Sequence, residues 1–113
     1  MELITLKEVC ASTGISRRAI QGYEKIGLVK AYEKNKYGHL LYDQKTVERI
    51  ERIRLYHRLG FKIKEIKEII DAPACVLRPA LEEKVELLEK DMELKKQLLL
   101  RAQEIIKELM VFG

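Results

Sequence analysis

The sequence predicts a mainly α-helical protein: a winged helix-turn-helix domain followed by one long helix. Three features predict it, namely two short capped helices around a glycine turn, a basic hairpin directly after them, and a C-terminal heptad pattern. A chain of 113 residues can hold one compact domain and one extended element. We expect residues 1–72 to form the winged domain, 73–80 a linker and 81–110 the long helix.

The first helix is expected from about Leu6 to Ser12. Thr5 and Glu8 have the spacing of a capping box, in which each side chain satisfies a backbone amide at the helix start. Gly14 then allows the sharp turn that a second, closely spaced helix requires.

The second helix is expected from about Arg17 to Lys25, capped by Ser16 and ended by Gly27. Two short helices joined by a short glycine-containing turn form a helix-turn-helix, whose second helix presents its first turn to DNA base edges. Arg17 and Arg18 lie in that turn. The alternative is an ordinary two-helix corner with exposed arginines.

Residues 28–42 are typical of a β-hairpin with a basic tip. Leu28 and Val29 begin one extended run, residues 40–42 form another, and Lys34 and Lys36 lie between them. A hairpin at this place is a wing, whose lysines are suited to phosphates. A solvated polar loop is the alternative.

Two further helices are expected, at residues 44–59 after the capping residue Asp43, and at 61–71 before a break at Pro73. Their apolar positions recur at helical spacing. The positions expected to face the core are Val47, Ile50, Ile53 and Leu55 in the first, and Phe61, Ile63, Ile66, Ile69 and Ile70 in the second.

The tail shows the clearest periodicity, with apolar residues in alternating steps of four and three and one polar intruder, Lys95. Such a helix is roughly 45 to 50 Å long, and leaving its apolar stripe in water is costly. We expect a second copy to cover it; the alternative is that it folds back on the front half. The expected dimerisation residues are Leu81, Val85, Leu88, Met92, Leu99, Ala102, Ile106 and Leu109.

The net charge is concentrated at the front. Residues 1–72 hold 15 Lys and Arg against 10 Asp and Glu, hence +5, whereas the remainder holds 7 against 8, hence −1. A polyanionic partner is therefore expected at the front, although a mild lysine excess on an ordinary surface is the alternative. No apolar run is long enough for a membrane span and no secretory signal is evident, so we expect a cytoplasmic protein without a membrane partner.

The front of the chain resembles the MerR family of bacterial transcription regulators. The matching stretches are "ITLKEVCASTGISRRAIQGYEKIGLV", "GHLLYD" and "LYHRLGFKIKEIKEII", within residues 4–72. The resemblance implies a homodimer joined by a long antiparallel coiled coil. It also implies binding to a pseudo-palindromic promoter in double-stranded DNA, which is distorted so that RNA polymerase can engage it.

The resemblance and the charges together suggest a set of DNA-binding residues, but the chain departs from the family's motifs. The family usually has R-Y-Y-E where this chain has Gln21-Gly22-Tyr23-Glu24. Leu40 and Glu33 replace wing arginines, and Ala31 replaces a proline. A protein-interaction module that has lost tight DNA binding is therefore the alternative. The expected DNA-binding residues are Ser16, Arg17, Arg18, Tyr23, Lys34, Lys36 and His39.

The remaining reactive side chains do not form a recognisable site. Cys10 and Cys75 are 65 positions apart without a nearby histidine, which is a poor match to a soft-metal site, so no metal and no cofactor are expected. His39 and His57 lack a neighbouring nucleophile, and no phosphate-binding glycine motif is present, so we expect no catalysis. A small apolar ligand between tail and front half is a third hypothesis, resting on the resemblance alone.

Overall fold

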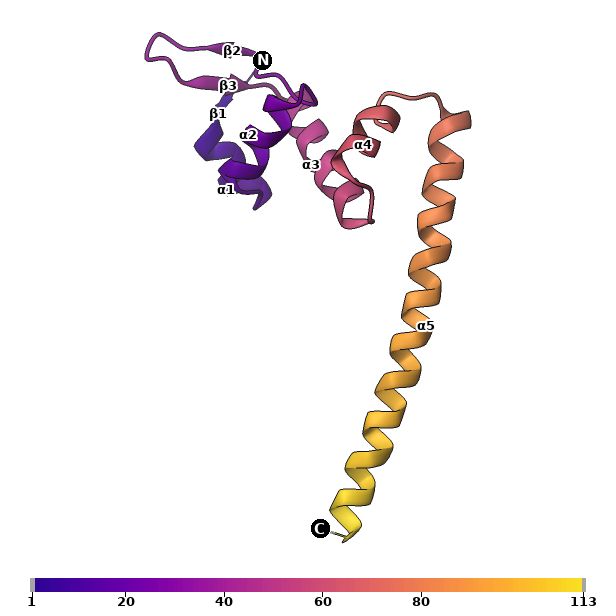
Figure 1. The fold of residues 1–113 in the computed structure, drawn as a ribbon. Coiled ribbons are helices and arrows are strands. Elements are labelled where there is room, and N and C mark those ends of the chain that lie inside the picture. The colour runs from indigo at the N-terminus through magenta and orange to yellow at the C-terminus, as the bar shows by residue number, and fades with distance from the viewer. Residues whose placement is uncertain (1, 113) are drawn as a thin grey trace. The chain divides into compact units, whose positions relative to one another are not determined.

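The computed structural model describes residues 2–112, whose course is shown in Figure 1. The chain divides into two compact units, Met1–Asp71 and Ala72–Gly113. Over the described residues, the first unit contains helices α1 to α4 and strands β1 to β3, and the second contains helix α5. This architecture confirms the mainly α fold class, with a wing and a long last helix. The pairing of that last helix in a coiled coil stays a prediction.

Helix α1 spans Leu6–Thr13, one residue beyond the expected end. The capping box is formed as predicted: the Thr5 hydroxyl accepts a hydrogen bond from the Glu8 amide at 3.3 Å, and the Glu8 carboxylate accepts one from the Thr5 amide at 3.0 Å. Gly14 follows with a φ of 73°, a left-handed conformation in which a glycine is favoured. The chain therefore turns at once toward the second helix.

Helix α2 spans Arg17–Lys25, as predicted. The Ser16 hydroxyl accepts a hydrogen bond from the Ala19 amide at 3.1 Å and so caps the helix. Ile20 and Tyr23, three residues apart on one face, are buried against the rest of the unit. The opposite face of α2 is consequently left to solvent along its length.

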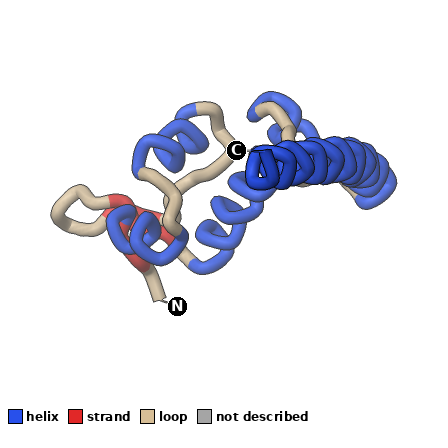
Figure 2. The backbone as a smooth tube through the Cα atoms, turned by 90° about the horizontal axis from the view of Figure 1, so that it is seen from below, coloured by secondary structure: helices blue, strands red, loops and turns tan. Residues whose placement is uncertain are grey.

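A small antiparallel sheet forms the wing and its base. It consists of β1 (Ile4–Thr5), β2 (Glu33–Lys34) and β3 (Leu40–Tyr42), in the order β1-β3-β2. Figure 2 shows the three strands in red at the base of a tan hairpin tip. Because β3 is paired on both sides, the wing is attached to the beginning of α1 as well as to its own hairpin partner.

The expected extended run at Leu28 and Val29 is wrong, since neither residue lies in a strand. Both side chains are buried. Consecutive residues of a strand point to opposite faces, so burying two neighbours against one core favours an irregular segment instead. Strand β1, which the sequence did not indicate, supplies the pairing on the other edge of β3.

Helices α3 (Gln44–Arg58) and α4 (Ile63–Ile69) complete the first unit. Leu55, expected in the core, is 53% exposed, and Tyr56 is buried in its place. The buried positions continue in steps of three from Val47, which leads to residue 56. Helix α4 is shorter than the predicted 61–71, although Phe61 and Ile70, which lie outside it, are also buried. The buried apolar side chains of this region are Val47, Ile50, Ile53, Tyr56, Phe61, Ile66, Ile69 and Ile70.

Helix α5 spans Ala74–Phe112 and is the whole second unit apart from its ends (Figure 1). It begins inside the segment predicted as a linker, and Pro79 lies within it. A proline removes one helical hydrogen bond, but the helix-forming residues around it keep the segment helical. None of the described helices, α5 included, combines the length and apolarity that a membrane span requires.

Candidate nucleic-acid interface

The first turn of α2 presents two cations to solvent. Arg17 and Arg18 follow the cap directly and both are exposed. Within residues 2–112 neither guanidinium forms a hydrogen bond or an ion pair. A helix N-terminus also carries unpaired backbone amides and a positive dipole end, so this turn attracts anions.

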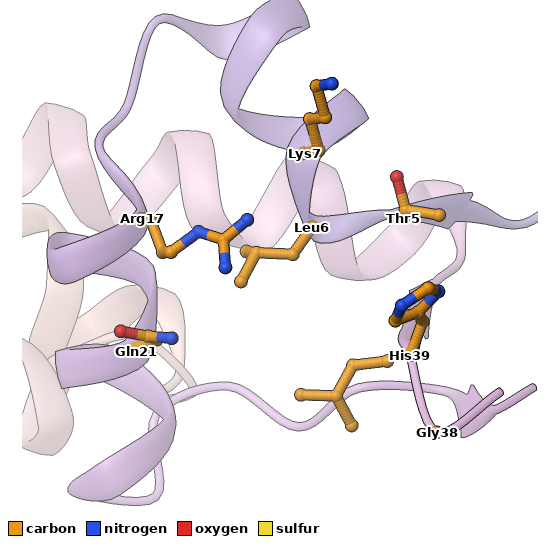
Figure 3. Close-up of a pocket in the computed structure, with 8 residues that line it drawn as sticks. Thr5, Leu6, Lys7, Arg17, Gln21, Gly38 and His39 are labelled. Carbon is orange, nitrogen blue, oxygen red and sulfur yellow. The ribbon is translucent and has the colours of Figure 1, made fainter.

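A hollow of about 500 Å³, the wing-side hollow, lies between α2, the start of α1 and the wing (Figure 3). Lys7, Arg17 and His39 contribute to it from three separate segments, and no carboxylate lines it. The tertiary fold therefore collects cations that are far apart in the sequence. The complete lining is Thr5, Leu6, Lys7, Arg17, Gln21, Gly38, His39 and Leu40.

The tip of the wing is held in a defined shape by Asn35. Its side-chain oxygen accepts hydrogen bonds from the Tyr37 amide at 2.9 Å and from the His39 amide at 3.0 Å. Its backbone carbonyl accepts a third from the Gly38 amide at 3.0 Å, and Gly38 has a φ of 82°. The tip is thus preorganised, and its side chains need little ordering when a partner binds.

The tip displays cations together with an aromatic ring. Tyr37 is 72% exposed, the Lys36 ammonium lies 5.1 Å from its ring centroid, and the His39 ring centroid lies 6.5 Å away. Lys34 is exposed on β2 beside them. Such a surface suits phosphates, with the ring available for apolar contact with sugar or base.

Two sets of side-chain contacts hold the wing and helices in place. The Tyr42 hydroxyl of β3 donates a hydrogen bond to the Glu24 carboxylate of α2. Burial, followed by the hydrogen bond to this carboxylate, raises the pKa of the tyrosine above its ordinary value, so the hydroxyl remains the donor of this bond. On α3, Arg49 donates to the Leu28 carbonyl at 2.6 Å and pairs with both oxygens of Asp71 at 2.7 and 2.9 Å. The relative position of wing and α2 is therefore fixed.

The expected DNA-binding residues differ in how much of their side chain is exposed. Tyr23 was expected to hold the DNA backbone, but it is only 5% exposed and contributes mainly to the core. Its spacing from Ile20 could have indicated this, since residues three apart share one helical face. The cap residue Ser16 and the cations of α2 and the wing remain candidates.

Three residues at this surface were missed: Lys7, Gln21 and Tyr37. Lys7 was not recognisable from sequence, because only the tertiary fold brings α1 beside the wing. Gln21 is on the same side of α2 as Arg17, four residues earlier, which is a signal that helical spacing provides. Tyr37 could have been found as the one aromatic residue between the tip cations.

The tail's apolar stripe is exposed in the single chain. Val85, Leu88, Met92, Leu99, Ile106 and Leu109 are between 39% and 70% exposed. Ala102 is also exposed, and Leu81 is half-buried. The intruder Lys95 forms an ion pair with Asp91 at 3.0 Å. Both cysteines are free: Cys10 is half-buried and Cys75 is exposed.

Comparison with known proteins shows which family the part of the chain that carries this surface matches. Residues 4–73 match the family model described as MerR HTH family regulatory protein. Nodulation protein NolA of Bradyrhizobium sp. strain NC92 is 36% identical over 64 residues, which is 57% of this chain and 27% of that protein. The chain thus spans about a third or less of the length of the first relatives it matches.

Solved structures show the same fold. A MerR-family transcriptional regulator from Bacillus cereus superposes with a TM-score of 0.75 at 25% identity, over 95% of this chain and 82% of that one. HiNmlR is described as a MerR-family regulator lacking the sensor domain, bound to promoter DNA. It superposes with a TM-score of 0.73 at 21% identity, over 86% of this chain and 79% of its own.

Proposed function

The chain belongs to the MerR family of helix-turn-helix regulatory proteins, which are transcription regulators rather than enzymes, and we propose on this premise that it binds promoter DNA as a homodimer. The observation that supports DNA binding most directly is the set of unpaired cations around the wing-side hollow. The first turn of α2 and the start of α1 contribute cations to one surface, and the wing adds the imidazole of His39. A double-stranded DNA with phosphates on both sides of its major groove is the partner that this surface fits.

Each candidate DNA-binding residue of α2 and the wing has an expected role in this proposal. Arg17 and Arg18 reach base edges or the phosphates beside them, because they lie in the first turn of α2. Lys34, Lys36 and His39 hold the backbone from the wing, and the Ser16 cap keeps the N-terminus of α2 directed at the groove. The resemblance to the family implies that two such units bend and untwist a pseudo-palindromic promoter for RNA polymerase. We propose the same distortion for this chain.

Dimerisation is proposed through α5. A helix of 39 residues is about 58 Å long, and its exposed leucines, isoleucines and valines run most of that length. A second copy offers a stripe of equal length and identical chemistry, and burial of both stripes is favourable at about 25 cal/mol per Å². The proposed seam is Leu81, Val85, Leu88, Met92, Leu99, Ala102, Ile106 and Leu109.

Fluorescence anisotropy tests the proposal. A labelled duplex from upstream of the protein's own gene is compared with a scrambled duplex at several salt concentrations. We expect saturable binding that prefers the upstream duplex and weakens steeply with salt, because each phosphate contact releases counterions. Resonance energy transfer between the two ends of the bound duplex measures the bend. Equal, weak binding to both duplexes that is lost at modest salt contradicts promoter recognition.

Equal, weak binding to both duplexes favours another candidate function, a protein-interaction module on the same scaffold. Gln21, Gly22, Glu33 and Leu40 stand where the family's motifs have DNA-contacting or wing residues, which is the observation behind this alternative. In that case the exposed face of α5 is the expected site of the protein partner.

A further inference from the structure

Gly22 lies in the middle of α2, where nothing in the fold requires a glycine. Its backbone is helical, and among the described residues no atom other than those of its chain neighbours and its own helix backbone lies within 4 Å of the position that a Cβ would occupy. Glycine is the least favourable helix residue apart from proline. The position is also exposed, so a side chain there would have met only water. The chain therefore gives up helix stability for open space beside α2.

The space belongs to a second hollow, the Gly22 hollow, of about 370 Å³ on the side of α2 that faces α3 and α4. The apolar part of its lining comes from Ala19 and Tyr23 of α2, from the C-cap residue Ile26 and from Ile63 of α4. Because no side chain projects from position 22, a partner's apolar surface can approach the helix backbone itself.

Two arginines and a histidine border the same hollow, whose surface is otherwise almost wholly apolar. Arg18 comes from α2, and Arg54 and His57 come from α3. Within residues 2–112 none of these three side chains has a hydrogen bond or an ion pair, and no carboxylate lines the hollow. An occupant with an apolar part and adjacent negative charge is complementary to this lining.

A DNA strand has that pattern, because its backbone alternates phosphates with deoxyribose rings whose carbon-bound faces are apolar. We propose that the Gly22 hollow seats one deoxyribose of the bound DNA, with the flanking phosphates facing Arg18 and Arg54. This inference rests on the proposed function. It assigns α2 a contact with the DNA backbone that requires position 22 to carry no side chain. Together with the wing-side hollow, it gives α2 a contact surface on each flank.

The test uses Gly22→Ala and Gly22→Leu in the full chain, with Ala11→Leu on the solvent face of α1 as a control for added apolar bulk. Thermal unfolding should show that Gly22→Ala raises Tm by about 4 to 8 °C, since alanine favours the helix. The same variant should bind the promoter duplex about fivefold more weakly, and Gly22→Leu more weakly still, because contacts lengthen when the backbone is held away. The control should bind as the unsubstituted protein does.

Weaker binding by the Gly22 variants could come from a displaced deoxyribose, from a lost phosphate contact or from a lost base contact. Two further readouts distinguish these three causes. The slope of affinity against salt should not change, because no charge is removed. The promoter and scrambled duplexes should lose affinity by the same factor, since deoxyribose carries no sequence information. Unchanged binding by Gly22→Leu, or a loss confined to the promoter duplex, would overturn the proposal. If the unsubstituted protein binds neither duplex, the proposed function itself is wrong, which is a distinct result.

Discussion

Replacing both wing lysines by alanine, Lys34→Ala with Lys36→Ala, should change the salt dependence of DNA binding by a calculable amount. Both lysines are on the hairpin, and neither pairs with a carboxylate among the described residues. Each is therefore available to a phosphate. A phosphate contact contributes about 0.9 to the slope of log affinity against log salt, so two per subunit contribute about 1.8 and a dimer about 3.6.

The expected difference is large enough to measure directly. Between about 0.1 and about 0.3 M salt, a slope difference of about 3.6 means that the unsubstituted protein loses about 50-fold more affinity than the variant. Anisotropy titrations of the promoter and scrambled duplexes at several salt concentrations give both slopes. Because phosphates are the same in every sequence, both duplexes should be affected alike.

Lys90→Ala is the matched control for the lost charge. Lys90 is exposed on α5, two residues from both Leu88 and Met92 and therefore away from the proposed seam. This substitution removes one charge per chain, against two in the wing variant, without touching the wing, so its slope should equal that of the unsubstituted protein. If the double wing variant keeps the full slope, or if Lys90→Ala flattens it equally, the wing does not contact phosphates.

Three other perturbations test the remaining structure. Leu99→Glu, in a seam position that is 58% exposed in the single chain, should shift the protein toward monomers in sedimentation equilibrium, and persistence of the dimer refutes the seam. Ser16→Ala should lower the free energy of unfolding by about 1 kcal/mol in urea titrations, because the Ala19 amide loses its cap; an unchanged midpoint contradicts this. The Arg49 hydrogen bonds lower the pKa of Asp71, so this carboxylate stabilises the fold above the unfolded pKa near 4 and loses that effect as pH falls through its lowered folded value. Asp71→Asn should therefore flatten the acid side of the stability curve, and an unaltered curve would show that the pair contributes nothing.

Local signals in the sequence determined the elements of the helix-turn-helix. The capping box at Thr5 and Glu8, the glycine at position 14 and the cap at Ser16 each act over three or four residues, and each is present as predicted. The length and periodicity of the tail likewise indicated a long helix. These features depend on neighbours along the chain, so they are visible without a fold.

Errors arose where burial depends on distant residues. Leu28 and Val29 pack into the core instead of forming a strand, and β1 pairs with β3 across more than thirty positions of sequence. The segment before the long helix, expected as a linker or as the approach to that helix, is helical from Ala74; here the cause is local, because favourable neighbours outweigh the single Pro79.

In the candidate interface too, some features follow from local sequence and others only from the tertiary structure. The sequence by itself determined which cations the second helix and the hairpin carry, since charge and helical spacing are properties of short segments. Only the tertiary structure decided that Lys7 joins them, that Tyr23 is taken into the core, and that Gly22 opens a hollow against α3 and α4. The physical reason is that a surface for a rigid partner is assembled from side chains that share a place in space, and contacts between elements set that place.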